Sequence, residues 1–330
     1  MITLNDKDIR PTNLIKKYHR LYQSDLRELK KEKLILVNCP ACNSKRFEHK
    51  FSKMGFKFVS CKKCNTLFIN PRPTESSLEK FYTKTKSSEF WTKIFERTKE
   101  TRKEKIFKPR IKLVFDILKK YDVIKCKKMV EVGAGYGWFC ELAKEKKLAK
   151  KIIAIEPSPK AAKICRKIEG IEVIESTIEK NLKKLQSDFI VSFESVHLLF
   201  NPRFFLQSCH NGLKKNGVLI FSLTNYLGFD IQILQEKSNY LIPTFLNLFN
   251  PNSIRFLLKS IGFRNVKVIT PGLMDVQIIL NKIKNKEIDP KKYPFFQFLL
   301  NCKSEQFIDD LQGILQKNNL SSHMVVSAQK

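Results

Sequence analysis

Three of the chain's 11 glycines, Gly133, Gly135 and Gly137, fall within five residues. An apolar run over 129–133 leads into this loop, and a helical stretch over 139–147 follows it. An α/β sheet places a ligand in this setting, at the carboxyl end of a strand, because glycine lets the backbone approach the ligand closely. The alternative is a glycine turn with a purely structural role.

The chain beyond the loop repeats this alternation of strand and helix. It predicts an α/β fold with a seven-stranded, mostly parallel, Rossmann-like sheet and helices on both faces. The candidate strands are 129–133, 152–156, 171–175, 188–193, 217–223, 264–269 and 323–328.

The spacing of the glycines distinguishes between two ligands. Dinucleotide sites use G-x-G-x-x-G, whereas this loop reads G-x-G-x-G and has Trp138 where the third glycine belongs, which counts against NAD. The spacing fits S-adenosylmethionine, which has no phosphate. Glu156 ends the next apolar run, where a carboxylate can accept both ribose hydroxyls and would repel the 2′-phosphate of NADP.

Four of the nine cysteines form two pairs upstream of the glycine loop. The pairs, Cys39/Cys42 and Cys61/Cys64, are separated by 18 residues, which is the spacing of a four-cysteine zinc ribbon. Four thiolates close the tetrahedral shell of Zn²⁺, so the sequence predicts one structural zinc with no position for a catalytic water. We expect phenylalanines between the pairs to give the hairpin a miniature core, and His49 to lie on its surface.

The net charge of +30 is concentrated before residue 129, where 34 basic side chains face 14 acidic ones. This excess suggests attraction to an anionic partner, such as a nucleic acid, a membrane surface or a phosphorylated small-molecule substrate. Only 12 of the 62 basic residues are arginine, the residue that nucleic-acid surfaces favour. A general lysine bias therefore explains much of the excess and is favoured over a dedicated polyanion site, with nucleic-acid binding as the second possibility.

Changes in pattern divide the chain into four parts. We expect an N-terminal helix in 1–36, the zinc ribbon in 37–73, a basic helical connector in 74–128 and a ligand-binding domain in 129–330. Within that domain, 225–260 and 271–318 are predicted insertions that cover the substrate side. The sequence has no apolar run of membrane-spanning length and no signal-peptide pattern, so we expect a cytoplasmic protein with reduced cysteines.

These motifs together resemble one known family. The chain is similar to class I S-adenosylmethionine-dependent methyltransferases with an N-terminal zinc ribbon, a bacterial group often linked to sugar and surface-polysaccharide biosynthesis. The resemblance spans roughly residues 36–330. It is carried by C-P-A-C and C-K-K-C, F-I-N-P-R-P (68–73), V-E-V-G-A-G-Y-G (130–137), A-I-E-P-S (154–158) and S-D-F-I-V-S-F-E (187–194).

The resemblance implies a set of cofactor-binding residues. They are Glu131, Gly133, Gly135, Gly137 and Glu156, with Ser176 or Thr177 near the adenine. Related proteins commonly carry a Glu-His pair after the fourth strand, but here the histidine, His197, is displaced by one position and lacks the adjacent acid.

The catalytic candidates come from the same segment. His197 has the side chain of a general base and, with Glu194, forms the predicted catalytic pair; a positioning role for His197 is the alternative. Asn225, Tyr226 and Asp230 follow the fifth strand and are the candidate substrate residues, whereas we expect His323 to be structural.

The resulting hypothesis is methyl transfer from S-adenosylmethionine to an oxygen or carbon of a small acceptor of the sugar or nucleotide-sugar type. Two alternatives remain open: an RNA methyltransferase that uses its basic N-terminal part, and a non-catalytic methyltransferase-like scaffold.

Overall fold

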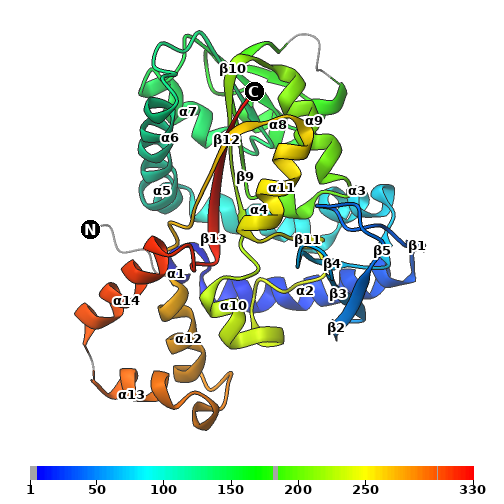
Figure 1. Ribbon diagram of the computed structural model, residues 1–330, viewed down its shortest axis with the longest axis vertical. Coiled ribbons are helices and arrows are strands. Elements are labelled where there is room, and N and C mark those ends of the chain that lie inside the picture. Colours follow the sequence, from blue (N-terminus) through cyan, green and yellow to red (C-terminus); the bar gives the residue numbers. More distant parts are fainter. Residues whose placement is uncertain (1–5, 181–184, 303) are drawn as a thin grey trace.

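A seven-stranded sheet forms the centre of the protein in the computed structural model, which describes residues 6–180, 185–302 and 304–330 (Figure 1). Its order is β12-β13-β10-β9-β6-β7-β8. Neighbours from β10 to β8 are parallel, whereas β13 runs antiparallel to both β10 and β12. The strands are β6 (Lys128–Val132), β7 (Lys151–Ile155), β8 (Glu172–Ile174), β9 (Ser187–Phe193), β10 (Leu213–Thr224), β12 (Arg264–Ile269) and β13 (His323–Gln329). The predicted mostly parallel sheet is confirmed.

Helices cover both faces of this sheet, which explains why its central strands are apolar on both sides. α6 (Lys108–Lys120) and α7 (Trp138–Glu145) pack on one face against residues such as Met129. α9 (Pro202–Gly212) and α11 (Pro251–Ile261) pack on the other face against residues such as Val130. α8 (Pro159–Cys165) follows β7 and begins at Ser158, whose hydroxyl accepts the amide of Ala161.

The N-terminal part is mainly helical, as its periodicity predicts. Its helices are α1 (Asp6–Ile9), α2 (Thr12–Lys31), α3 (Glu75–Lys84), α4 (Lys86–Arg97) and α5 (Lys99–Arg102). The hydroxyl of Thr74 accepts the amide of Ser77 and caps α3. A π-helical turn, η1 (Lys103–Phe107), joins α5 to α6. Such turns are frequent at functional sites, and this one reaches the cavity described below.

The ribbon is a sheet of four strands rather than an isolated hairpin. β2 (Phe47–Lys53), β3 (Phe56–Cys61) and β4 (Leu67–Ile69) are joined by β11 (Asn247–Leu248), which comes from the predicted insertion 225–260. β1 (Leu34–Ile35) pairs with β5 (Arg72–Pro73). The expected miniature core is not separate, because Phe58 packs with Leu26 of α2 and Leu246 in a larger cluster. Burial against other elements replaces the small hairpin core that local pattern suggested.

Arg72 connects the ribbon to the rest of the chain. Its side chain is 1% exposed and donates hydrogen bonds to the carbonyls of Ile69, Leu246 and Phe200 and to the side chain of Asn247. Burial lowers its pKa to about 10, so the guanidinium remains charged at neutral pH.

The remaining helices form a lobe beyond the sheet, at the lower left of Figure 1. Buried apolar residues of α10 (Phe229–Leu234), α12 (Asp275–Lys284), α13 (Pro294–Cys302) and α14 (Glu305–Lys317) make its core. Short 3₁₀ turns are η2 (Ile178–Lys180), η4 (Val196–Leu198), η5 (Gln235–Lys237) and η6 (Pro290–Lys292). In the described parts of the chain, no helix is both long and apolar enough to cross a membrane.

Candidate active site

A cavity of about 590 Å³ lies where the glycine loop meets the ends of the central strands. One wall consists of Glu131 and residues 133–136, and another comes from η1 and the first turns of α6. Glu194, Thr224 and His323 line the cavity beside the sheet edge. Its volume lies within the range of small-molecule sites in proteins. The cavity therefore joins the predicted cofactor loop to the predicted catalytic segment.

The three loop glycines meet different structural requirements. All three have positive φ angles, of 74°, 56° and 76° for Gly133, Gly135 and Gly137. A Cβ on Gly137 would lie 2.5 Å from the sulfur of Cys165, so close packing requires this glycine. A Cβ on Gly135 would meet nothing within 4 Å, and Gly135 lines the cavity. The loop thus leaves open space next to its backbone, as a bound ligand would require.

Two carboxylates stand behind the glycine loop. Glu131 is buried at the end of β6, accepts a hydrogen bond from the Cys140 thiol and lines the cavity. Burial raises its pKa to about 8. Glu156 follows β7 and accepts the amides of Gly135 and Ser158, each at 2.8 Å. These two bonds leave further lone pairs on its oxygens that could accept hydroxyl groups of a ligand at the loop. Glu156 is 8% exposed and is not on the cavity wall formed by the described residues.

Glu194 points into the cavity from the turn after β9. Its φ angle of 56° is unusual for a residue with a side chain, and such backbone strain is often found at functional sites. The hydroxyl of Ser222 donates to its Oε1 at 2.6 Å. Enclosure in the cavity opposes ionisation, but His323, His197 and Arg110, together with the Ser222 hydroxyl, outweigh it and lower the pKa of Glu194. The group is therefore a carboxylate at neutral pH.

The two candidate histidines occupy different environments. His197 is 1% exposed, packs against Phe245 at 4.1 Å between ring centres, and is not on the cavity wall formed by the described residues. Burial lowers its pKa to about 4, and its Nδ1 lacks a hydrogen-bond partner among the described residues. His323, expected to be structural, lines the cavity and places Nδ1 3.4 Å from Oε1 of Glu194. The structure therefore groups Glu194 with His323 at the cavity.

The predicted substrate residues lie away from the cavity wall, as far as the described residues define it. Asn225 is fully buried, and its side chain donates to the carbonyls of Ser321 and Asn319. Tyr226 packs in the cluster beneath the ribbon. Asp230 is also fully buried, and neither of its carboxylate oxygens has a hydrogen-bond partner there. The backbone of this stretch is held by the amides of Asn225 and Phe229, which donate to the carbonyls of Ser322 and Leu320 before β13, and by the amide of Tyr226, which donates to the carbonyl of Phe249.

Ser176 and Thr177 lie after β8, and neither belongs to the described cavity wall. Ser176 is half-buried and its amide donates to the carbonyl of Ile174. A role for either residue near an adenine stays a prediction.

Arg110 was not singled out from the sequence. Its guanidinium lies 4.3 Å from the ring centre of Phe193 and interacts with the carboxyl groups of Glu194 and Glu131. Burial lowers its pKa. In the sequence it is one of many basic residues on a helix, so local pattern does not distinguish it from a solvent-exposed one. Arg10, Arg102 and Lys105 also line the cavity, which makes its wall rich in positive charge.

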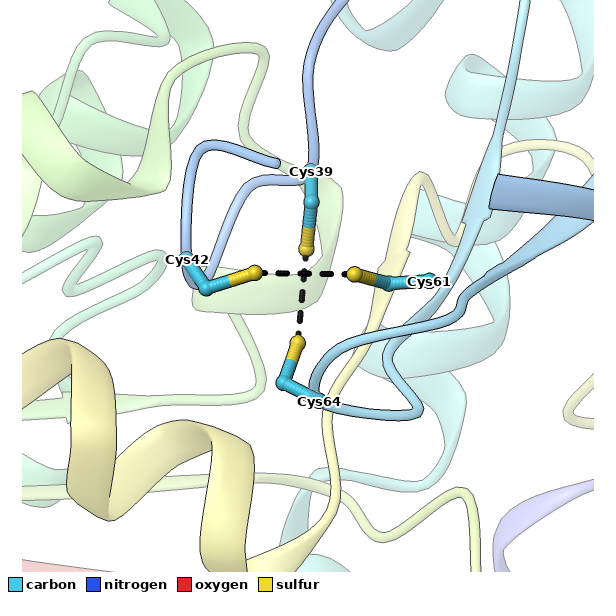
Figure 2. A group of neighbouring side chains, drawn as sticks. All are labelled: Cys39, Cys42, Cys61 and Cys64. Carbon is cyan, nitrogen blue, oxygen red and sulfur yellow. Dashed lines mark hydrogen bonds between the residues drawn. The ribbon is translucent and has the colours of Figure 1, made fainter. Parts of the chain in front are cut away.

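The four paired cysteines form a second site, within the ribbon. Their sulfurs all lie within 4.8 Å of one another, and Figure 2 shows them converging on one point. The distances between the sulfurs of Cys39 and Cys64 and between those of Cys42 and Cys61 are both 3.5 Å. A zinc ion with Zn–S bonds of about 2.3 Å has its four ligands about 3.8 Å apart, so the donor set fits Zn²⁺. His49 is exposed and hydrogen-bonds to Ser52, outside this cluster.

The four-cysteine cluster is held by elements of both the ribbon and the sheet domain. The side chain of Asn250, which caps α11, donates to the carbonyls of Cys64 and Asn65. Arg203 of α9 donates to the carbonyl of Ala41, between the first two cysteines. The ribbon loops are therefore anchored to the helices that cover one face of the sheet.

Comparison with known families agrees with this architecture. The family model described as "Methyltransferase domain" matches residues 86–268, which is more than half of the chain. The chain therefore belongs to this methyltransferase family. A comparison with curated proteins gave no match.

Solved structures with a similar fold are methyltransferases. The plantazolicin methyltransferase BamL, solved with a triazolic desmethylPZN analog and SAH, is 13% identical with a TM-score of 0.51; the match covers 77% of this chain and 94% of that one. A SAM-dependent methyltransferase from Archaeoglobus fulgidus is 22% identical with a TM-score of 0.44, over 67% of this chain and 94% of that one. At these identities the likeness concerns the fold alone.

Proposed function

We propose that this protein is an S-adenosylmethionine-dependent methyltransferase acting on a small anionic acceptor of the sugar or nucleotide-sugar type. The observation that carries the proposal is the cavity shared by the glycine loop and the Glu194 segment in a chain of the methyltransferase family. Bound S-adenosylmethionine would supply an electrophilic methyl group on a sulfonium. The protein's contribution would be mainly to position the acceptor.

The residues proposed for the cofactor are Glu131, Gly133, Gly135 and Glu156, with Gly137 shaping the loop. The open space at Gly135 supports close approach of a ligand to the backbone. The spare lone pairs of Glu156 support hydrogen bonds from ribose hydroxyls. Burial of Glu156 removes water from its carboxylate and raises its pKa. Hydrogen bonds from ribose hydroxyls would replace that water and favour the ionised form.

The charge of the cavity supports an anionic acceptor. Four basic residues line it, Arg10, Arg102, Lys105 and Arg110, against the acidic residues Glu131 and Glu194. One of the four, Lys105, is also ion-paired with Asp8 at 2.6 Å. A pKa of about 8 leaves Glu131 mainly protonated at neutral pH, which makes the wall more positive still. A phosphate or carboxylate on the acceptor would be attracted to this wall.

We also propose that the chain has four parts, with boundaries after residues 36, 73 and 128, and that the ribbon holds one structural zinc. The proposed compartment is the cytoplasm, because a reducing environment maintains the free thiols that the four-cysteine site needs.

Calorimetric titration with S-adenosylmethionine tests the cofactor assignment. Glu156→Ala should weaken binding by about 2–3 kcal/mol if both ribose hydrogen bonds are charge-assisted. The matched control is Glu172→Ala, which removes an exposed carboxylate on the edge strand β8 and should leave the affinity unchanged. Unchanged affinity in Glu156→Ala would refute the assignment of this acid. Tighter binding of NAD than of S-adenosylmethionine would refute the function.

Methyl transfer from tritiated S-adenosylmethionine tests the acceptor class. We expect label on members of a panel of nucleoside-diphosphate sugars and not on bulk RNA at about 150 mM salt. Lys105→Gln should raise the KM for a labelled anionic acceptor more than it changes kcat. The control, Lys112→Gln, alters an exposed lysine of α6 outside the cavity. Label on RNA alone would overturn the small-acceptor proposal.

A further inference from the structure

The cavity contains a histidine and a carboxylate from distant parts of the chain. Glu194 follows β9, and His323 begins β13, with β10 lying between these two strands. Thr224, the last residue of β10, is the register partner of His323 and also lines the cavity. Because β13 runs antiparallel to β10, its first residue lies at the sheet edge where the parallel strands end. The topology therefore brings His323 to the ligand-binding edge.

The carboxylate is fixed before any ligand arrives. The amide of Glu194 donates to the carbonyl of Ser222 at 3.1 Å, and the Ser222 hydroxyl donates to Oε1 of Glu194 at 2.6 Å. Ser222 is fully buried in β10, so this support is rigid. Oε1 lies 3.4 Å from Nδ1 of His323, a separation from which a hydrogen bond can form when the substrate complex tightens.

The orientation of the imidazole leaves its other nitrogen for chemistry. With Nδ1 toward Glu194, Nε2 is on the opposite side of the ring. His323 keeps 34% of its side-chain surface accessible and lines the cavity. A carboxylate that accepts Nδ1–H fixes the tautomer in which Nε2 carries the lone pair.

We propose that His323, oriented by Glu194, is the general base that removes the proton from a hydroxyl of the acceptor. This inference rests on the proposed function and adds to it the residue that takes the proton. In the reaction, the acceptor O–H bond breaks and its proton moves to Nε2. The oxygen electron pair forms the bond to the methyl carbon, and the electrons of the methyl–sulfur bond remain on sulfur. The imidazolium that results is stabilised by the Glu194 carboxylate.

The charged groups around His323 are consistent with this role. Burial lowers the pKa of His323, whereas Glu194 after β9 and Asp275 of α12 raise it and Arg110 of α6 lowers it. The net effect is a lower pKa, so the ring is neutral at pH 7 and can accept a proton. At this pH the Arg110 guanidinium and the Ser222 hydroxyl favour the ionised form of Glu194.

Acylation of the folded, full-length protein with diethyl pyrocarbonate at pH 7 tests the geometry without knowledge of the acceptor. The reagent modifies accessible neutral imidazoles, and mass spectrometry locates the product. We expect His323 to react, and saturating S-adenosylmethionine to slow its reaction severalfold. The exposed His49 of the ribbon serves as the internal control and should react at the same rate with or without S-adenosylmethionine. Glu194→Gln should slow acylation at His323 severalfold and leave His49 unchanged.

Two variants complete the test. In the tritium assay, His323→Gln should lower methyl transfer by about 10²–10⁴-fold, the usual contribution of a general base, while calorimetry gives an unchanged affinity for S-adenosylmethionine. His49→Gln is the matched control with wild-type transfer. Failure of the wild-type protein to bind S-adenosylmethionine would refute the proposed function. Binding by the wild type together with an unreactive or unprotected His323, or with full transfer by His323→Gln, would refute the base alone.

Discussion

Replacing Asp230 with asparagine should make the protein more stable at alkaline pH. Both oxygens of Asp230 are buried without hydrogen-bond partners among the described residues. Burial, with a smaller contribution from the charge of Asp275, raises its pKa from 3.8 to about 8. Asp275 itself accepts bonds from Ser321, Ser322 and Gln312, so the uncompensated group of the pair is Asp230.

The sign and size follow from proton linkage. Between pH 5 and pH 8 the unfolded carboxyl is ionised, whereas the folded one keeps its proton, so the folded state binds one more proton. Stability then falls as pH rises, by about 1.36 kcal/mol for each tenfold drop in proton concentration. Over this range the wild type should lose up to about 4 kcal/mol relative to Asp230→Asn, which cannot ionise.

Urea unfolding followed by circular dichroism at pH 5 and pH 8 measures this difference. The control is Asp309→Asn, which changes an exposed acid of α14 and should track the wild type at both pH values. Comparing variants also removes the contribution of Glu131, whose pKa is raised by burial in every protein of the set. If the difference in unfolding free energy between the wild type and Asp230→Asn is the same at pH 5 and pH 8, proton linkage through Asp230 is refuted.

Three further predictions concern the ribbon and the basic surface. Elemental analysis should find about one zinc per chain, and Cys64→Ser should lose the metal and have a lower Tm. The control, Cys302→Ser, changes an exposed cysteine of α13 and should keep both the metal and the Tm. A metal-free wild-type protein with an unchanged Tm would contradict this prediction. Arg72→Met should cost about 3–5 kcal/mol of unfolding free energy, because several buried acceptors lose their donor; a loss below about 1 kcal/mol in denaturant unfolding would show that these bonds contribute little. RNA binding should be weak and disappear near about 150 mM salt, because it would depend on releasing counterions; nanomolar affinity at that salt, measured by filter binding, would show that the N-terminal charge is functional.

Local patterns in the sequence were sufficient to predict the sheet and the four-cysteine cluster. Each central strand is an apolar run that is buried on both faces, and each covering helix repeats its apolar residues at helical spacing, so both signals lie within a few neighbouring residues. The cysteine pairs are equally local, since two residues between cysteines make a turn that directs both sulfurs to one point. The signal for the glycine loop is local as well, because its three glycines lie within five residues, directly after a strand.

The composition of the cavity depended on contacts between distant segments. Asn225 and Asp230 follow a strand at the expected edge, but both are fully buried, and the side chain of Asn225 donates to carbonyls of the segment before β13. His323 is 129 residues away from Glu194 in the sequence, and the two meet because β13 inserts antiparallel beside β10. Sequence spacing predicts which face of an element a residue occupies, but only the packing of elements decides which faces meet. The fold was therefore determined by local hydrophobic pattern, and the candidate base was determined by tertiary structure.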